Sequence, residues 1–102
     1  MIIKKQYLKT KPVCKVTFRL PADIGSESHE ANLVGEFNGW DVTATPMKRL
    51  KDGAFTVTID LEKDREYQFR YLLDRKHWEN ASNADRHEET PYGDSYNSIV
   101  IV

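Results

Sequence analysis

The sequence predicts an all-β fold, a sandwich of two antiparallel sheets with essentially no helix. Apolar and polar residues alternate over residues 14–20, 31–37, 55–61 and 67–73, which is the period of a strand with one buried face. Dipeptides typical of tight turns, such as Asp52-Gly53, separate these segments. No segment has the spacing of an amphipathic helix. Strands with a single apolar face bury it by packing two sheets against each other.

The first half of the chain supplies three strands and a long polar loop. A short strand is expected over residues 5–9, and Pro21 ends the strand at residues 14–20. Residues 23–30 form the loop, and the strand at residues 31–37 ends at the turn Asn38-Gly39.

The second half continues the same pattern. A short strand over residues 47–51 leads through Asp52-Gly53 into the strand at residues 55–61, and a charged turn at residues 63–65 precedes the strand at 67–73. The chain then turns at residues 74–76 and returns. Residues 80–94 are expected to form a long polar loop, of the kind that is often functional. Residues 96–102 are rich in β-branched side chains and form the last strand.

Length and composition point to one domain over residues 1–102. The net charge is -1, from 15 Lys+Arg against 16 Asp+Glu, so bulk charge favours neither a nucleic acid nor a membrane surface as partner. No apolar run is long enough for a transmembrane helix or a signal peptide. The single cysteine, Cys14, lies on an apolar strand face and favours a reducing, cytoplasmic location.

Trp40 is the first candidate binding residue, because it follows the turn Asn38-Gly39 at the end of a predicted strand. An indole on a turn suits the stacking of a sugar ring, since a pyranose has C–H groups on one face and hydroxyls around its rim. The alternative interpretation is that Trp40 folds back and caps the end of the sandwich.

Trp78 is the second candidate and lies on the segment that returns after the turn at residues 74–76. Strict alternation places Arg70 on the polar side of its strand together with Gln68. An arginine beside an indole suits hydrogen bonds to sugar hydroxyls. The alternative is a solvated cation whose aliphatic stem covers Trp78.

Acidic and imidazole side chains are scattered over residues 77–89 without the spacing of a metal site. They are His77, Glu79, Asp85, His87, Glu88 and Glu89. A metal needs convergent, deprotonated ligands, and a glycosidase needs two carboxylates flanking the scissile bond. Glu79 and Asp85 can be imagined in that role, but nothing specifies them. We expect a solvated polar loop here, and neither metal nor cofactor.

Several motifs together resemble a known family. In chain order they are residues 15–19, the run Val-Gly-Glu-Phe-Asn-Gly-Trp-Asp at 34–41, Pro-Met-Lys at 46–48, residues 55–61, the run Tyr-Gln-Phe-Arg-Tyr at 67–71 with Asp74 and Trp78, and residues 97–102. Over residues 13–102 the chain resembles the isoamylase-type early-set domains, which are carbohydrate-binding module family 48. This family includes the glycogen-binding domain of the AMP-activated protein kinase β subunit and the N-terminal domains of α-glucan branching and debranching enzymes.

The resemblance implies an immunoglobulin-like β-sandwich that binds α-glucan without catalysis, since the hydrolytic residues of such enzymes lie in a barrel that this sequence lacks. It implies ring stacking on two tryptophans and hydrogen bonds from a basic residue and an asparagine. One departure concerns a Leu-Gly-Thr segment of the kinase-type domains: Ser95 can replace the threonine hydroxyl, but the leucine has no counterpart. The candidate sugar-binding residues are Trp40, Trp78, Arg70, Asn97, Ser95 and Lys76.

The leading hypothesis is therefore a non-catalytic module that binds an α-glucan such as glycogen, starch or maltodextrin. The alternative is a protein-interaction module that docks on a glucan-metabolising or other enzyme and has lost sugar binding. A minimal glycosidase is a third hypothesis. Exposed aromatic residues clustered with Arg70 and Asn97 favour sugar, whereas aromatic residues spread over a sheet with Tyr7, Tyr92 and Tyr96 favour a protein partner.

Overall fold

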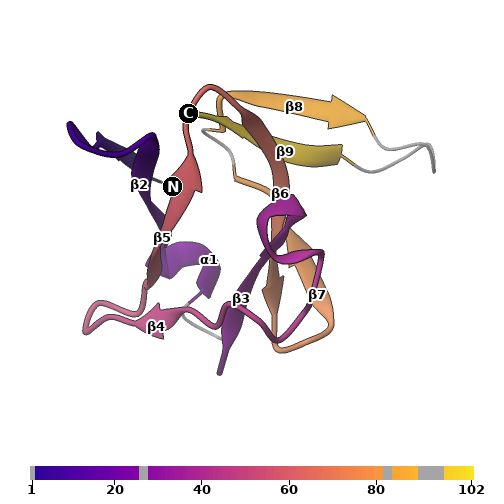
Figure 1. The fold of residues 1–102 in the computed structure, drawn as a ribbon. Helices are drawn as coiled ribbons and strands as arrows, with labels where there is room; N and C mark the ends of the chain where they lie inside the picture. Colours follow the sequence, from indigo (N-terminus) through magenta and orange to yellow (C-terminus); the bar gives the residue numbers. More distant parts are fainter. Residues whose placement is uncertain (1, 26–27, 82–83, 90–95) are drawn as a thin grey trace.

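The protein folds into two antiparallel sheets that face each other (Figure 1). The computed structural model describes residues 2–25, 28–81, 84–89 and 96–102. The first sheet has the strand order β1-β2-β5-β4 and the second β3-β6-β9-β8, with β7 paired to β6. The strands are β1 (Ile2–Tyr7), β2 (Val13–Leu20), β3 (Ala31–Gly35), β4 (Lys48–Arg49), β5 (Phe55–Glu62), β6 (Glu66–Leu73), β7 (His77–Glu79), β8 (Arg86–Glu89) and β9 (Tyr96–Ile101).

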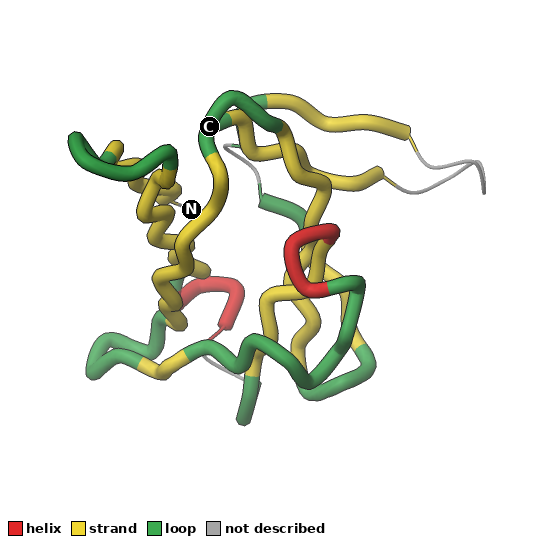
Figure 2. Tube along the Cα trace, viewed as in Figure 1, coloured by secondary structure: helices red, strands yellow, loops and turns green. Residues whose placement is uncertain are grey.

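Helical structure is confined to single turns, as the tube in Figure 2 makes plain. Among the described residues these turns are α1 (Ala22–Gly25) and the 3-10 turn η1 (Glu36–Asn38). Neither is long and apolar enough to cross a membrane. The predicted fold class, an all-β sandwich with essentially no helix, is confirmed.

Several elements differ from the sequence prediction. The strand expected over residues 47–51 is reduced to β4 (Lys48–Arg49), and the loop expected over residues 23–30 begins with the single turn α1 (Ala22–Gly25). The strand expected over 31–37 ends at Gly35, because the chain turns into η1. The first strand is β1, at Ile2–Tyr7, instead of residues 5–9. The segment 80–94, predicted as a loop, contains β8, whose four residues are all exposed. A charged sequence without apolar alternation suits an edge strand, where the ladder to β9 supplies the stabilising bonds.

The hydrophobic core lies between the sheets and is built from alternate residues of their strands. Phe18 of β2 and Phe69 and Tyr71 of β6 are fully buried. The rings of Phe18 and Phe69 meet edge to face with their centroids 5.0 Å apart, a favoured aromatic geometry. Cys14 is also fully buried in this core, as predicted.

Asp85 joins the two sheets beside the core. Its carboxylate accepts a hydrogen bond of 2.7 Å from Lys5 Nζ on β1 and another of 2.7 Å from the N–H of Ile101 on β9. Burial favours the neutral acid, but these donors outweigh it and lower the pKa of Asp85. The carboxylate thereby ties the edge strand of one sheet to an inner strand of the other.

The Tyr71 hydroxyl is buried without a hydrogen-bond partner in the described residues. Removing an unpaired buried hydroxyl relieves its desolvation penalty, so Tyr71→Phe should raise the free energy of unfolding by about 1 kcal/mol at pH 7. Urea denaturation measures this change. Tyr67→Phe is the matched control, because the Tyr67 hydroxyl donates to the Glu62 carbonyl at 3.2 Å, and its loss should not stabilise. Equal destabilisation by both variants would contradict the prediction.

The same hydroxyl has a consequence at high pH. Burial raises the pKa of Tyr71 above its ordinary value of 10.0. The phenol of the unfolded chain therefore ionises at a lower pH than that of the folded protein, and the free energy of unfolding falls as the pH rises above 10. Between pH 9 and about 12, the free energy of unfolding should therefore fall less in Tyr71→Phe than in the wild type.

Candidate functional site

Three of the candidate residues share the outer face of the second sheet, the side turned away from the core. Along β6, Phe69 and Tyr71 belong to the core, so Arg70 between them and Gln68 before them point outward, as the alternation predicts. The β6–β7 ladder sets Trp78 beside Leu72, another outward position. Asn97 of β9 reaches the same face through its contacts with Gln68 and Arg70.

This outer face has an apolar floor that the sequence analysis did not predict. Val34 and Leu72 are 0% and 3% exposed although they lie outside the core between the sheets. All five residues of β3 are buried, so the prediction that the outer side of this strand is polar and exposed was wrong. The cross-strand neighbours explain this burial, since Val34 lies beside Arg70 and Leu72 beside Trp78, and such long side chains cover adjacent apolar surface.

A chain of side-chain hydrogen bonds crosses this face. Arg70 Nε donates to Asn97 Oδ1 at 2.7 Å, and Asn97 Nδ2 donates to Gln68 Oε1 at 2.7 Å. Gln68 Nε2 in turn donates to Glu88 Oε2 on β8 at 3.5 Å. We call these four residues the polar network. Two of the residues expected to bind sugar hydroxyls, Arg70 and Asn97, are therefore in direct contact.

The polar network lies where one edge of β6 changes its partner. That edge pairs with β9 from Glu66 to Phe69 and with β7 from Tyr71 to Leu73. Arg70 stands between the two ladders, at a point that we call the fork. On the β9 side, the fully buried Ser98 accepts a hydrogen bond from the Ala81 N–H at 2.9 Å.

The turn Gly35–Trp40 (Gly-Glu-Phe-Asn-Gly-Trp) holds the end of β3 against β6. A Cβ atom at Gly35 would lie 2.6 Å from the Gln68 carbonyl oxygen and 2.8 Å from Phe69 Cβ, so glycine is required for this close approach. Phe37 then fills the end of the core, with its ring centroid 6.1 Å from those of Phe18 and Tyr67.

Asn38 fixes the shape of this turn through its side chain. Its Oδ1 accepts the Gly35 N–H at 3.1 Å, and its Nδ2 donates to the Leu33 carbonyl at 2.9 Å and to Thr45 Oγ1 at 3.0 Å. An asparagine amide can satisfy donors and acceptors at once. The predicted turn at Asn38-Gly39 is confirmed, and its asparagine links β3 to the segment that runs back beside it.

Trp40 follows in an unusual backbone conformation. Gly39 and Trp40 have φ values of 67° and 59°, and the Trp40 N–H donates to the Gly35 carbonyl at 2.9 Å. The left-handed region costs a bulky residue roughly 1–2 kcal/mol. The indole is 39% exposed. The backbone is thus strained at a position that leaves much of a large apolar side chain in water, a combination typical of a functional residue.

Trp78 is presented by a tight hairpin between β6 and β7. Three residues separate the paired Leu73 and His77. The first two, Asp74 and Arg75, have φ values of 50° and 59°, the positive φ that a type I′ turn requires at its central residues. Asp74 Oδ1 accepts the N–H groups of Glu30 at 3.0 Å and His29 at 2.7 Å, which ties the hairpin to the segment before β3. Trp78 is 43% exposed.

The remaining candidates stand apart from the polar network. Lys76 is exposed in the hairpin turn, where its N–H donates to the Leu73 carbonyl at 3.1 Å. Ser95 lies outside the described residues. Across the described part of the chain, no ring contact joins Trp40 to Trp78, and no hydrogen bond joins Trp40 to Arg70 or Asn97. The structure therefore groups Trp78, Arg70 and Asn97 on one face and leaves Trp40 at the end of β3.

The scattered acidic and imidazole residues have local partners. His77 Nε2 lies 2.8 Å from Glu79 Oε1, and His87 Nε2 lies 2.7 Å from the Ala81 carbonyl. Asp85 bridges the two sheets, as described above. Within the described ranges, no three His, Cys, Asp or Glu side chains gather as metal ligands.

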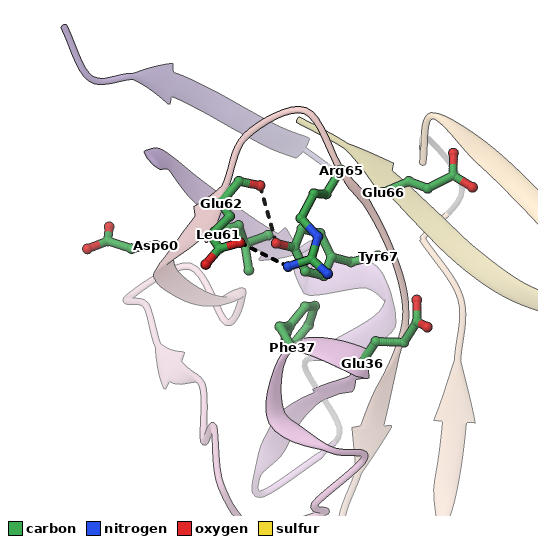
Figure 3. A pocket seen from close by; sticks show the side chains of 8 residues that line it. All are labelled: Glu36, Phe37, Asp60, Leu61, Glu62, Arg65, Glu66 and Tyr67. Carbon is green, nitrogen blue, oxygen red and sulfur yellow. Dashed lines mark hydrogen bonds and ion pairs between the residues drawn. The ribbon is translucent and has the colours of Figure 1, made fainter. Parts of the chain in front are cut away.

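A cleft of about 490 Å³ opens between the end of β5, the start of β6 and η1 (Figure 3). Phe37 and Tyr67 line it, and its carboxylates are paired within the protein. Glu62 lies 2.9 Å from Arg65, Glu66 lies 2.7 Å from Arg86, Glu36 accepts the Gln68 N–H at 2.6 Å, and Asp60 lies 3.8 Å from Lys15. The polar network and Trp78 are not among the lining residues.

Sequence reasoning passed over Gln68 and Glu88 as members of the site. Gln68 precedes Arg70 by two residues, and this spacing places both on one strand face. Glu88 gave no comparable indication, because its place depends on the pairing of β8 with Asn97 of β9.

Backbone strain at position 40 can be separated from loss of the indole by two substitutions. Trp40→Gly and Trp40→Ala both remove the ring, but only alanine keeps the left-handed penalty, so the glycine variant should be about 1 kcal/mol more stable. Denaturant unfolding measures the difference. At Trp78, which lies in a strand, alanine should be the more stable of the two by roughly 0.5–1 kcal/mol. If the same residue, glycine or alanine, were the more stable at both positions, backbone strain at Trp40 would be contradicted.

Asp74 should make the stability depend on acid. The N–H groups of Glu30 and His29 stabilise its carboxylate and lower its pKa below the ordinary value of 3.8. This contribution is present above that pKa and is lost as the pH falls through the lowered value. In Asp74→Asn, the free energy of unfolding should therefore fall less steeply between pH 5 and about 2 than in the wild type, as urea titrations at each pH would measure. Parallel curves would contradict this assignment.

Comparison with known proteins places the chain in a family. The family model described as carbohydrate-binding module 48 (isoamylase N-terminal domain) matches residues 12–85, a range that includes Trp40, Arg70 and Trp78. Over 76 residues the chain is 35% identical to the 1,4-alpha-glucan branching enzyme GlgB of Photobacterium profundum, a match that covers 68% of this chain. The chain spans about 10% of the length of that curated relative. Because the family model covers more than half of its residues, this chain belongs to the carbohydrate-binding module 48 family.

Proposed function

We propose that this protein binds α-glucan chains, such as glycogen, starch or maltodextrin, without catalysing their conversion. The observation that carries the proposal is the grouping of the exposed Trp78 indole with the hydrogen-bonded pair Arg70 and Asn97 on one face. The name of the related branching enzyme refers to the same class of polymer.

The chemistry of this face suits a glucose ring. The Trp78 indole offers a flat apolar surface to the C–H face of a pyranose, while polar groups beside it reach the hydroxyls at the rim. Arg70 uses Nε for Asn97, and its terminal nitrogens, which have no hydrogen-bond partner among the described residues, can donate to a hydroxyl oxygen. Asn97 retains one N–H and one acceptor site. Lys76 and Ser95 are further candidates for hydroxyl contacts.

Trp40 supplies a second stacking surface in this proposal. The strain at its backbone favours a functional role over the alternative of a cap, since a cap alone would be served by residues that tolerate the turn better. Each stacked ring contributes about 1 kcal/mol or more. Together with the hydrogen bonds to hydroxyls, and after the cost of ordering the sugar, we expect a dissociation constant from tens of micromolar to about 1 mM, which corresponds to about 4–6 kcal/mol.

The placement of other exposed aromatic residues favours sugar binding over the docking of a partner enzyme. Tyr7 and Tyr96 are 53% and 52% exposed, but they belong to β1 and β9 in different sheets. Tyr96 also alternates with Asn97 along β9, so its side chain leaves the strand on the other side. Neither extends the face that carries Trp78 and Arg70. Tyr92 lies outside the described residues.

Tryptophan fluorescence during titration with maltoheptaose and β-cyclodextrin tests the proposal. We expect a saturable change with both α-linked sugars and none with cellohexaose. Trp78→Ala should weaken binding at least ~10-fold, and Trp40→Ala should weaken it as well, because each removes a stacking surface. Calorimetry provides the affinity where a variant has lost its fluorescent reporter.

Tyr96→Ala is the matched control, since it removes an exposed aromatic ring from β9 without touching the proposed face. Its affinity for maltoheptaose should equal that of the wild type. Absence of any change up to about 10 mM sugar, a limit set by the weakest useful affinities, would overturn the proposal and favour the protein-docking alternative.

A further inference from the structure

We propose that Gln68 is a positioning residue for glucan recognition, which holds the Asn97 amide and through it Arg70 in the orientation that binds sugar. This inference rests on the proposed function of the same face. It follows from the direction of the hydrogen bonds in the polar network and from the place of Asn97 at the fork.

The backbone of β6 does not hold Asn97. The ladder between β6 and β9 ends with the pair Phe69 and Ser98, one residue before Asn97 is reached. Beyond that pair, β7 takes the edge of β6. Within the described residues, the strand partner of Asn97 is Glu88 on the edge strand β8, so its side chain needs another link to stay beside Arg70.

Gln68 provides that link. Its Oε1 accepts the Asn97 Nδ2–H at 2.7 Å, which leaves Asn97 Oδ1 to accept the Arg70 Nε–H at 2.7 Å. A side-chain amide has one donor end and one acceptor end. Arg70 can only donate, so the bond to Gln68 stabilises the one orientation of the Asn97 amide in which its oxygen faces Arg70.

Glu88, at the other end of the polar network, favours the same orientation of the Gln68 amide. Gln68 Nε2 donates toward the Glu88 carboxylate at 3.5 Å, so its Oε1 is turned toward Asn97. Every hydrogen bond in the network then points from the Arg70 cation to the Glu88 anion. Aligned bonds of this kind polarise one another and strengthen together.

The Gln68 backbone is anchored separately from its side chain. Its N–H donates to Glu36 Oε1 at 2.6 Å, and its carbonyl lies against Gly35. A substitution at Gln68 changes the side-chain network and leaves these main-chain contacts in place. The side chain is consequently open to a clean test.

Gln68→Leu removes both side-chain hydrogen bonds at similar size. It should weaken maltoheptaose binding about 5-fold, the effect of one hydrogen bond. In an Asn97→Ala background the same substitution should cause no further loss, because its effect acts through Asn97. Gln68→Glu combined with Glu88→Gln keeps the acceptor for Asn97 and supplies a donor at position 88, so this double variant should stay within about 2-fold of the wild type. Gln6→Leu, on β1 of the other sheet, is the matched control and should have no effect.

Nuclear magnetic resonance of the free protein tests the positioning itself. The side-chain signals of the Asn97 amide and the Arg70 Nε–H should shift in Gln68→Leu and keep their positions in Gln6→Leu. Unchanged signals in Gln68→Leu, independent losses in Gln68→Leu with Asn97→Ala, or an affinity of Gln68→Glu with Glu88→Gln no better than that of Gln68→Leu would each overturn the inference.

The two proposals fail in different ways. A wild type that binds no α-glucan ends the proposed function, and with it a role for Gln68 in sugar recognition, while the resonance experiment still decides whether Gln68 orients Asn97. A wild type that binds, with Asn97 and Gln68 acting independently, leaves the proposed function intact and refutes the role of Gln68.

Discussion

The change of partner along one edge of β6 is the constraint on which the candidate face depends. A strand edge can satisfy only one neighbour at a time, so β9 must leave where β7 begins. The side chain at the point of exchange, Arg70, meets an asparagine from the departing strand that lies 27 residues further along the chain. The two ladders bring distant polar groups together without a dedicated loop.

The two tryptophans are presented by opposite physical means. Trp78 lies in a regular hairpin whose turn geometry suits the twist of its strands. Trp40 stands on a turn that needs a close approach at Gly35, three side-chain hydrogen bonds from Asn38 and a left-handed backbone at the tryptophan itself. Residues of the turn before Trp78, Asp74 and Arg75, have positive φ values, whereas at the other site Trp40 itself has the left-handed conformation.

Alternation predicted the strands that have one buried face, and it failed where both faces are covered. β2 follows the period of two closely, but the outward Leu72 of β6 is buried beside Trp78, and β3 is buried along its whole length with Val34 paired to Arg70. β8 was not predicted, because its charged residues show no alternation of apolar and polar side chains. The resemblance to a family named Arg70 and Asn97 as candidates for sugar contacts, but their direct hydrogen bond became visible only in the structure. The link through Gln68 depends on the register of β6, β8 and β9. The alternation of residues within a single strand does not predict this register.

The position of β9 inside the second sheet has a consequence for synthesis. Residues 96–101 lie between β6 and β8, so the sheet cannot close until they have left the ribosome. At about 5–20 residues per second, β6 emerges a few seconds before its partner. During that interval the nascent chain carries an unpaired strand edge beside the aromatic residues of an unfinished core, which is the kind of surface that chaperones cover and that aggregates recruit.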